Sequence, residues 1–149
     1  MYVYFLISLA VVFFDLLTKY FVRSCMSLGE IIPIFPFFNF VYVLNKGISF
    51  SMFTETAPWL LTVVASFICL VVCYCLIKEK SCFSKVCLAL ILGGAVGNIA
   101  DRLYLGAVVD FLDFYIDKWH WPAFNVADSA ICIGVALLIY QSIFMKEKK

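Results

Sequence analysis

Long runs of apolar residues, separated by segments richer in polar residues, set the pattern of this chain. Residues 57–77 carry no charged side chain over 21 positions, enough for a helix to cross the hydrocarbon core of a membrane. Residues 2–22 form a second run, interrupted only by Asp15 and Lys19. This run lacks a basic start and a small-residue cleavage site, so we interpret it as a retained helix instead of a secretory signal peptide.

Two further runs lie in the second half of the chain. Residues 129–145 are uncharged and just long enough to span, whereas residues 86–100 span only if the helix continues past Asp101 and Arg102. The pattern therefore predicts four transmembrane helices within a single integral-membrane domain, residues 1–149, at about residues 3–22, 57–77, 86–105 and 128–146.

The connections between these helices differ in length. Residues 23–56 and 106–127 join helices on one side, and the shorter loop 78–85 lies on the other. Within the first connection, residues 31–50 (IIPIFPFFNFVYVLNKGISF) are rich in aromatic and β-branched residues. Two prolines near the start of this segment exclude a helix there, and Asn45-Lys46-Gly47 is typical of a turn. We therefore predict an all-α membrane protein with a small extended or β element on its outer face.

The composition supports this class. Hydrophobic residues make up 65% of the chain and charged residues 14%, which lies outside the range of ordinary soluble domains. The net charge of +1 provides no basic stripe for nucleic acid, so no nucleic-acid partner is expected.

Basic residues in the connections predict the orientation. The side holding loop 78–85 and the carboxyl terminus carries Lys78, Lys80, Lys85, Lys146, Lys148 and Lys149. The opposite side carries Arg23, Lys46 and Lys118. Because basic loops stay in the cytoplasm, both termini are expected there, with the long connections and the three tryptophans, Trp59, Trp119 and Trp121, at the outer face.

The seven cysteines do not form a recognisable site. Their number is odd, most lie within predicted helices, and no C-x-x-C pair expected of a thiol oxidoreductase occurs. Cys69, Cys73 and Cys75 could be imagined as metal ligands, but thiols at this spacing in lipid behave as small apolar side chains. We expect neither a metal nor a cofactor.

Charges inside apolar segments are costly and mark candidate functional sites. Asp15 and Lys19 are four residues apart on one helix face, where they can neutralise each other. A structural ion pair that locks two helices together is an equally good interpretation of these two residues.

The segment GGAVGNIADR, residues 93–102, combines small and polar positions. Asn98, Asp101 and Arg102 share one helix face, and Gly93 and Gly97 form a small-xxx-small pair that allows a neighbouring helix to approach closely. The glycines are therefore expected to bring another helix against a polar face.

Asp110 and Asp128 follow the third helix and begin the fourth. Helices that are antiparallel neighbours bring these two positions together although they are 18 residues apart. Two close carboxylates cannot both ionise easily, so one keeps a proton and the pair can serve as base and acid on a water. Asp128 could instead be only a helix N-cap, and Asp113 and Asp117 are expected to be solvated loop charges.

Several motifs together resemble the lipoprotein signal peptidase family, the type II signal peptidases of bacteria. They are DLLTK (15–19), NKGISF (45–50), GGAVGNIADR (93–102), VVDF (108–111) and WPAFNVADS (121–129). They occur in the family's order and span essentially the whole chain. Two departures are Leu16, where the family usually has Gln, and Ser49, where it usually has Ala; neither touches the aspartate pair.

The resemblance implies a multi-pass inner-membrane aspartyl endopeptidase that cuts prolipoproteins just before a diacylglyceryl-modified cysteine. Asp110 and Asp128 correspond to its catalytic pair. Substrate-binding or supporting roles are implied for Asp15, Lys19, Asn45, Asn98, Arg102 and Asn125, to which we add Asp101 beside Arg102. The expected enzyme is monomeric, contacts membrane lipid and has its active site near the outer, periplasmic face.

Three other classes of membrane protein fit the sequence less well. A proton- or ion-coupled carrier also uses intramembrane carboxylates, but it would be built from two related halves, which this sequence lacks. A presenilin-type protease would carry a Gly-x-Gly-Asp motif, which is absent. A purely structural four-helix scaffold explains the apolar content but not two aspartates flanking one loop.

Overall fold

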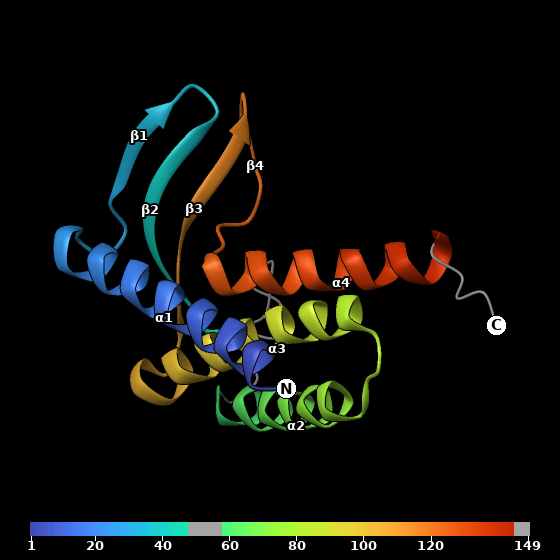
Figure 1. Ribbon diagram of the computed structural model, residues 1–149. Helices are drawn as coiled ribbons and strands as arrows, with labels where there is room; N and C mark the ends of the chain where they lie inside the picture. Colours follow the sequence, from blue (N-terminus) through green and yellow to red (C-terminus); the bar gives the residue numbers. More distant parts are fainter. Residues whose placement is uncertain (48–57, 145–149) are drawn as a thin grey trace.

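The computed structural model describes residues 1–47 and 58–144, which form four helices and one small sheet (Figure 1). The elements in chain order are α1 (Tyr2–Cys25), β1 (Ile31–Phe35), β2 (Phe38–Asn45), α2 (Pro58–Lys78), α3 (Cys82–Leu105), β3 (Val108–Ile116), β4 (Trp119–His120) and α4 (Val126–Phe144). Each of the four helices is long and apolar enough to cross a membrane. The predicted fold class, helical with a small β element, is confirmed.

α3 is the central helix, because it packs against α1, α2 and α4 and is the most buried of the four. Glycines make this possible. A methyl group at Gly93 would lie 2.7 Å from the Ser8 carbonyl oxygen of α1, and one at Gly134 of α4 would lie 2.7 Å from the Cys87 carbonyl oxygen of α3. The predicted close approach of another helix to the Gly93–Gly97 face is confirmed, and that helix is α1.

The sheet is antiparallel, in the order β1-β2-β3-β4, and stands at the end of the helices where α1 ends and α4 begins (Figure 1). Its buried residues Val109 and Phe111 pack on Val22 of α1, and this apolar cluster fixes the sheet to the helices. β2 ends at Asn45, whose side-chain oxygen accepts the Gly47 N–H at 3.0 Å, so the predicted turn forms. Residues 48–57 of the predicted outer element lie outside the described residues.

The helix bounds differ from those predicted. α3 begins at Cys82 instead of near residue 86, because Ser81 caps it by accepting the Ser84 N–H on its hydroxyl oxygen. α4 begins at Val126 instead of residue 128. α1 and α2 cover Tyr2–Cys25 and Pro58–Lys78, close to the predicted 3–22 and 57–77.

The connection 106–127 was expected to be a loop, and here the expectation was wrong. It contains β3 and β4, and β3 pairs with β2 across the sheet. Gly106, with a φ of 71°, ends α3 in the left-handed conformation and turns the chain into β3. Asp110 therefore lies on a strand.

Candidate active site

Lys19 occupies the centre of a buried charge cluster between α1 and α3. Its ammonium lies 2.7 Å from Asp15 Oδ2, 3.1 Å from Asp101 Oδ2 and 3.0 Å from Asn98 Oδ1. Lys19 and Asp15 are 1% and 0% exposed. The predicted Asp15–Lys19 ion pair is confirmed, and Asp101 is a further partner that the sequence did not indicate. A methyl group at Gly97 would lie 2.6 Å from Asp15 Oδ2, so only glycine leaves room for this carboxylate.

The two carboxylates of this cluster also bind the backbone of the elements around them. Asp15 Oδ1 accepts the Ala127 N–H at 2.8 Å, and Asp101 Oδ2 accepts the Val109 N–H at 2.9 Å. The first bond holds the start of α4 and the second holds the start of β3. The cluster thus fixes the two elements that carry Asp128 and Asp110.

Two asparagines connect the Lys19 cluster to the aspartates. Asn98 Oδ1 accepts from Lys19, and Asn98 Nδ2 donates to Asp128 Oδ1 at 2.7 Å. Because an ammonium can only donate, Lys19 fixes which end of this amide faces Asp128. Asn125 Nδ2 donates to Asp110 Oδ1 at 2.7 Å and to Asn98 Oδ1 at 3.3 Å.

Asn125 is also the N-cap of α4. Its Oδ1 accepts the Asp128 N–H at 2.8 Å, the bond that an N-cap side chain makes three residues into a helix. Asp128 lies in the first turn of α4 and is not the cap, so its carboxyl group is not used for that purpose. The alternative interpretation of Asp128 as an N-cap is therefore wrong.

Asp110 lies on β3 with 2% of its surface exposed. Its Oδ1 accepts from Asn125, and its Oδ2 accepts from Asn45 Nδ2 at 3.0 Å. Burial, and next the nearby negative charge of Asp128, raise the pKa of Asp110 to about 7, although the hydrogen bonds from Asn45 and Asn125 act in the opposite direction. A group with this pKa changes its protonation state near neutral pH.

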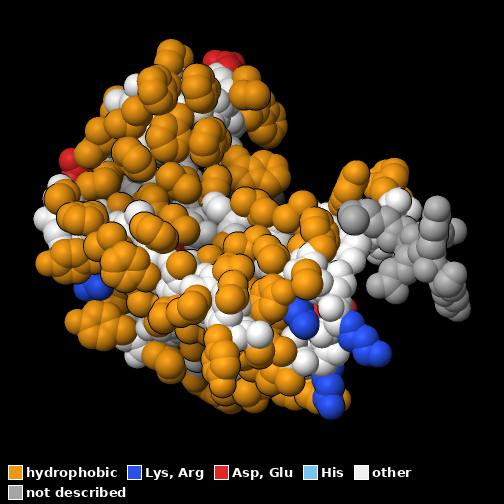
Figure 2. Space-filling model, viewed as in Figure 1, with side chains coloured by type: hydrophobic (Ala, Val, Ile, Leu, Met, Phe, Trp, Pro, Cys, Tyr) orange, Lys and Arg blue, Asp and Glu red, His pale blue; other side chains and the backbone are white. Residues whose placement is uncertain are grey.

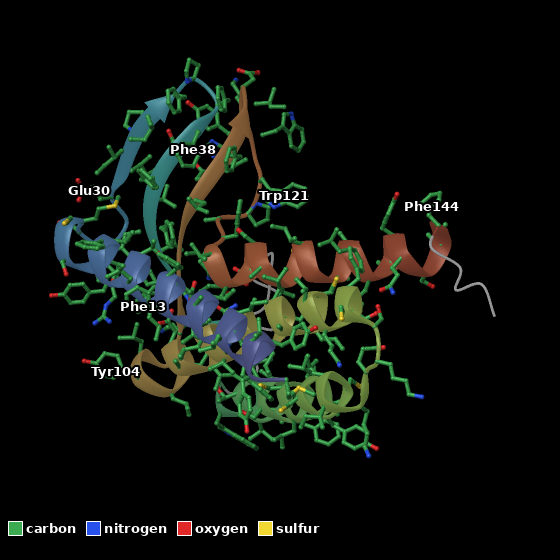
Figure 3. All side chains as sticks on the ribbon, in the orientation of Figure 1. Phe13, Glu30, Phe38, Tyr104, Trp121 and Phe144 are labelled. Carbon is green, nitrogen blue, oxygen red and sulfur yellow. The ribbon has the colours of Figure 1, made fainter. Side chains whose placement is uncertain are left out.

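Asp110 and Asp128 line one cavity of about 470 Å³. One wall of the cavity is the segment from Trp121 to Phe124, which connects β4 to α4. Figure 3 shows Trp121 at the junction of the sheet and α4. The structure thus brings the two predicted aspartates to the same cavity, with apolar side chains around them.

A second cavity of about 300 Å³ adjoins the first between α2, α3 and α4. Asn45, Asp128 and Cys132 line both cavities. Arg102 lines the second, and its Nη2 donates to the Gly47 carbonyl oxygen at 3.3 Å. Arg102 therefore faces Asp128 and the end of β2. Asp101, which was predicted to share a helix face with Arg102, contacts Lys19 instead.

The prediction for Asp113 was wrong. This residue was expected to be a solvated loop charge, but it lies on β3 with 6% of its surface exposed. Its carboxylate accepts from Asn39 Nδ2 at 2.8 Å and pairs with His120 Nδ1 at 2.9 Å. The alternation of Val109, Phe111 and Asp113, all buried on one face of β3, was the signal that could have indicated this. Asp117 lies exposed in the turn between β3 and β4, as expected.

All seven cysteines are free, and only Cys87 is fully buried. Within residues 1–47 and 58–144, His, Cys, Asp and Glu side chains form no group of three or more that could hold a metal ion. That the protein is active in the absence of a metal ion remains a prediction.

Comparisons with known proteins agree with this arrangement. The family model described as "Signal peptidase (SPase) II" matches residues 7–144. The chain is 44% identical to the lipoprotein signal peptidase of Paraburkholderia phymatum, covering 92% of this chain and 85% of that protein. It is 40% identical to that of Blochmanniella pennsylvanica, covering 89% and 83%.

A solved structure described as a bacterial membrane enzyme has the same fold. The two superimpose with a TM-score of 0.87 at 32% identity, over 100% of this chain and 94% of that one. None of these similarities supports a carrier. The resemblance seen in the sequence motifs is confirmed, and the chain belongs to the signal peptidase II family of proteases.

Proposed function

We propose that this chain is an aspartyl endopeptidase that removes the signal peptide of bacterial prolipoproteins just before the diacylglyceryl-modified cysteine. Asp110 and Asp128 are its catalytic residues. The observation that supports this most strongly is their position on one cavity, each held by an amide that is itself fixed by the network around Lys19.

The pair acts through one shared proton. Near neutral pH one carboxyl group is ionised and the other is protonated, because burial and mutual repulsion oppose a double charge. The ionised group takes a proton from water, and the resulting hydroxide adds to the carbonyl carbon of the scissile peptide. The protonated group donates to the carbonyl oxygen. When the C–N bond breaks, a proton passes to the leaving amine, which yields a carboxylic acid and an amine.

The supporting residues orient this pair. Asn45 and Asn125 each donate to one oxygen of Asp110, while Asn98 donates to Asp128 Oδ1. These amides fix the planes of both carboxyl groups toward the cavity. Arg102 is placed to bind polar groups of the substrate backbone, since it lines the second cavity beside Asp128. Asp15, Lys19 and Asp101 hold α1, α3, α4 and β3 together behind the pair.

The proposed setting is the bacterial inner membrane, with both termini in the cytoplasm and the site at the outer face. Figure 2 shows an apolar surface over the helices and the sheet, with basic side chains gathered where α2 and α3 meet. That end lies opposite the sheet (Figure 1). A monomer surrounded by membrane lipid suffices for this scheme, because one chain supplies both aspartates.

The test is cleavage of a purified prolipoprotein that carries the diacylglyceryl group, by the purified chain in detergent. We expect a new amino terminus at the modified cysteine by mass spectrometry, and no cleavage of the same precursor without the lipid. The same rate is expected in EDTA. Absence of cleavage of the lipidated precursor, or a loss of activity in EDTA that zinc restores, would contradict the proposal.

A further inference from the structure

The regular pairing between β3 and β4 is short. β4 has two residues, and these pair with β3 as Trp119 with Ile116 and His120 with Tyr115. The turn between them includes Asp117 with a φ of 54°, a left-handed conformation that glycine, asparagine and aspartate adopt more readily than other residues. Side-chain contacts add to the few backbone hydrogen bonds that position β4 and the segment after it.

Side chains from three neighbouring strands meet at Asp113. Asn39 lies directly opposite Asp113 on β2 and donates to its Oδ2, while His120 of β4 lies 2.9 Å and 3.0 Å from its two oxygens. The His120 ring stacks on Tyr115 with a centroid distance of 4.9 Å and an angle of 14°. We name these four residues, Asn39, Asp113, Tyr115 and His120, the Asp113 clasp.

The carboxylate of Asp113 determines which ring nitrogen of His120 carries a hydrogen. An ionised carboxylate only accepts hydrogen bonds, so Nδ1 of His120 must carry a hydrogen and donate it. Without His120, the carboxylate of Asp113 would keep Asn39 as its one side-chain partner among the described residues. A buried carboxylate with too few hydrogen bonds raises the free energy of the folded state. The hydrogen bond from His120 to Asp113 therefore stabilises the position of β4 beside β3.

The residue after His120 begins the wall of the catalytic cavity. Trp121, Pro122, Ala123 and Phe124 all line the cavity that holds Asp110 and Asp128. The two ends of this segment are bonded to β3, by the Trp121 N–H to the Phe114 carbonyl oxygen at 2.8 Å and by paired bonds between Phe124 and Leu112. Pro122 has no N–H to contribute between them.

We infer that Asp113 and His120 are positioning residues that hold the 121–124 wall over the cavity and thereby determine the affinity for the substrate chain. The inference rests on the proposed function for its kinetic consequence. The clasp lies on β2, β3 and β4, and no described contact joins it to the aspartate pair, so it is expected to act on binding and to leave the chemical step unchanged.

The kinetic test compares Asp113→Asn, His120→Ala and the double variant with wild type on the lipidated precursor. Each single variant is expected to raise KM about fivefold to tenfold, the effect of losing one modest hydrogen bond, with kcat within about twofold. The double variant should be no worse than the more affected single one, since the two groups act on each other. His120→Asn, which returns a donor near Nδ1, should recover most of the lost affinity.

Asp117→Asn is the matched control, because it makes the same substitution in the same hairpin at an exposed turn residue. It should leave KM and kcat unchanged. His120 is half exposed, at 51% of its side chain, so His120→Ala tests the inference even if Asp113→Asn does not fold.

Hydrogen exchange separates this inference from the proposed function. In His120→Ala the amides of residues 119–124 should exchange faster than in wild type, while those of α3 keep their protection. This readout needs no substrate, so it remains informative if the wild type cleaves no precursor. Unchanged exchange in residues 119–124, a fall in kcat with unchanged KM, or additive effects in the double variant would each overturn the inference.

Discussion

Lys19 has three partners although its side chain is almost completely buried. Two are carboxylates, Asp15 and Asp101, and the third is the amide oxygen of Asn98. Buried charges are tolerated when they are paired and hydrogen-bonded. Here the backbone N–H groups of Ala127 and Val109 donate to Asp15 Oδ1 and Asp101 Oδ2, and Asp15 Oδ2 has the Lys19 ammonium as its ionic partner. At the scale of single residues, the cost of burying charge is offset by a network that ends at Asp110 and Asp128.

The raised pKa of Asp110 predicts how stability depends on pH. In the unfolded chain an aspartate titrates near 4, whereas the folded value is about 7. Between these values the folded state binds more protons than the unfolded state. The contribution of Asp110 to stability is therefore fully present below about pH 4 and is lost as pH rises toward 7.

The measurement is the Tm of the detergent-purified protein at pH 5 and pH 8. The fall in Tm between these values should be larger in wild type than in Asp110→Asn, which cannot titrate at this position. Equal falls in the two proteins would contradict the assignment of a raised pKa to Asp110. The difference reports the titration of Asp110 together with its coupling to Asp128.

At the scale of elements, the packing of α1 on α3 depends on a glycine that faces a charge. A methyl group at Gly97 would lie 2.6 Å from Asp15 Oδ2, which is held by Lys19 and cannot move freely. Gly97→Ala is therefore expected to separate α1 from α3, at a cost of about 1–3 kcal/mol typical of overpacking. It should lower both Tm and the rate of cleavage.

Val96→Ala is the control for this substitution, since Val96 precedes Gly97 on α3 and is 38% exposed. This variant should keep a Tm close to that of wild type. If Gly97→Ala had the wild-type Tm and activity, the close contact between α1 and α3 would not be required for the site.

The sequence predicted those elements and contacts that depend on local spacing. The four helices follow from the apolar runs, and the Asp15–Lys19 pair from its separation of four residues. The contact of Lys19 with Asp101 depends on how α1 and α3 pack, which no local pattern encodes. Asp113 was misassigned because aspartate is usually exposed, and its partner Asn39 is 74 residues away in the chain.

At the scale of the whole molecule, the polar site lies at one end of an apolar helical body. The sheet and the cavity lined by Asp110 and Asp128 share this end, and the loop between α2 and α3 lies at the other (Figure 1). With the basic residues at the latter end in the cytoplasm, the aspartate pair would lie at the outer face.

Thiol labelling of intact cells tests this orientation. In a variant with the seven native cysteines replaced, Lys118→Cys in the β3–β4 turn should react with a membrane-impermeant reagent added outside. Lys80→Cys, between α2 and α3, should react only after the membrane is opened. Outside labelling at residue 80 would contradict the orientation, as would protection of residue 118. Glu55, also expected outside, lies beyond the described residues.

The most direct test of the account is the activity of Asp110→Asn and Asp128→Asn on the diacylglyceryl-modified precursor. Each variant should accumulate as folded protein in the membrane and cleave nothing, because an amide can neither take the proton from water nor share one with its partner. The double variant should be no worse than either single one, since residues that act as a unit are non-additive. Asp117→Asn should cleave at the wild-type rate. Substantial turnover by either Asp110→Asn or Asp128→Asn would contradict the aspartyl mechanism.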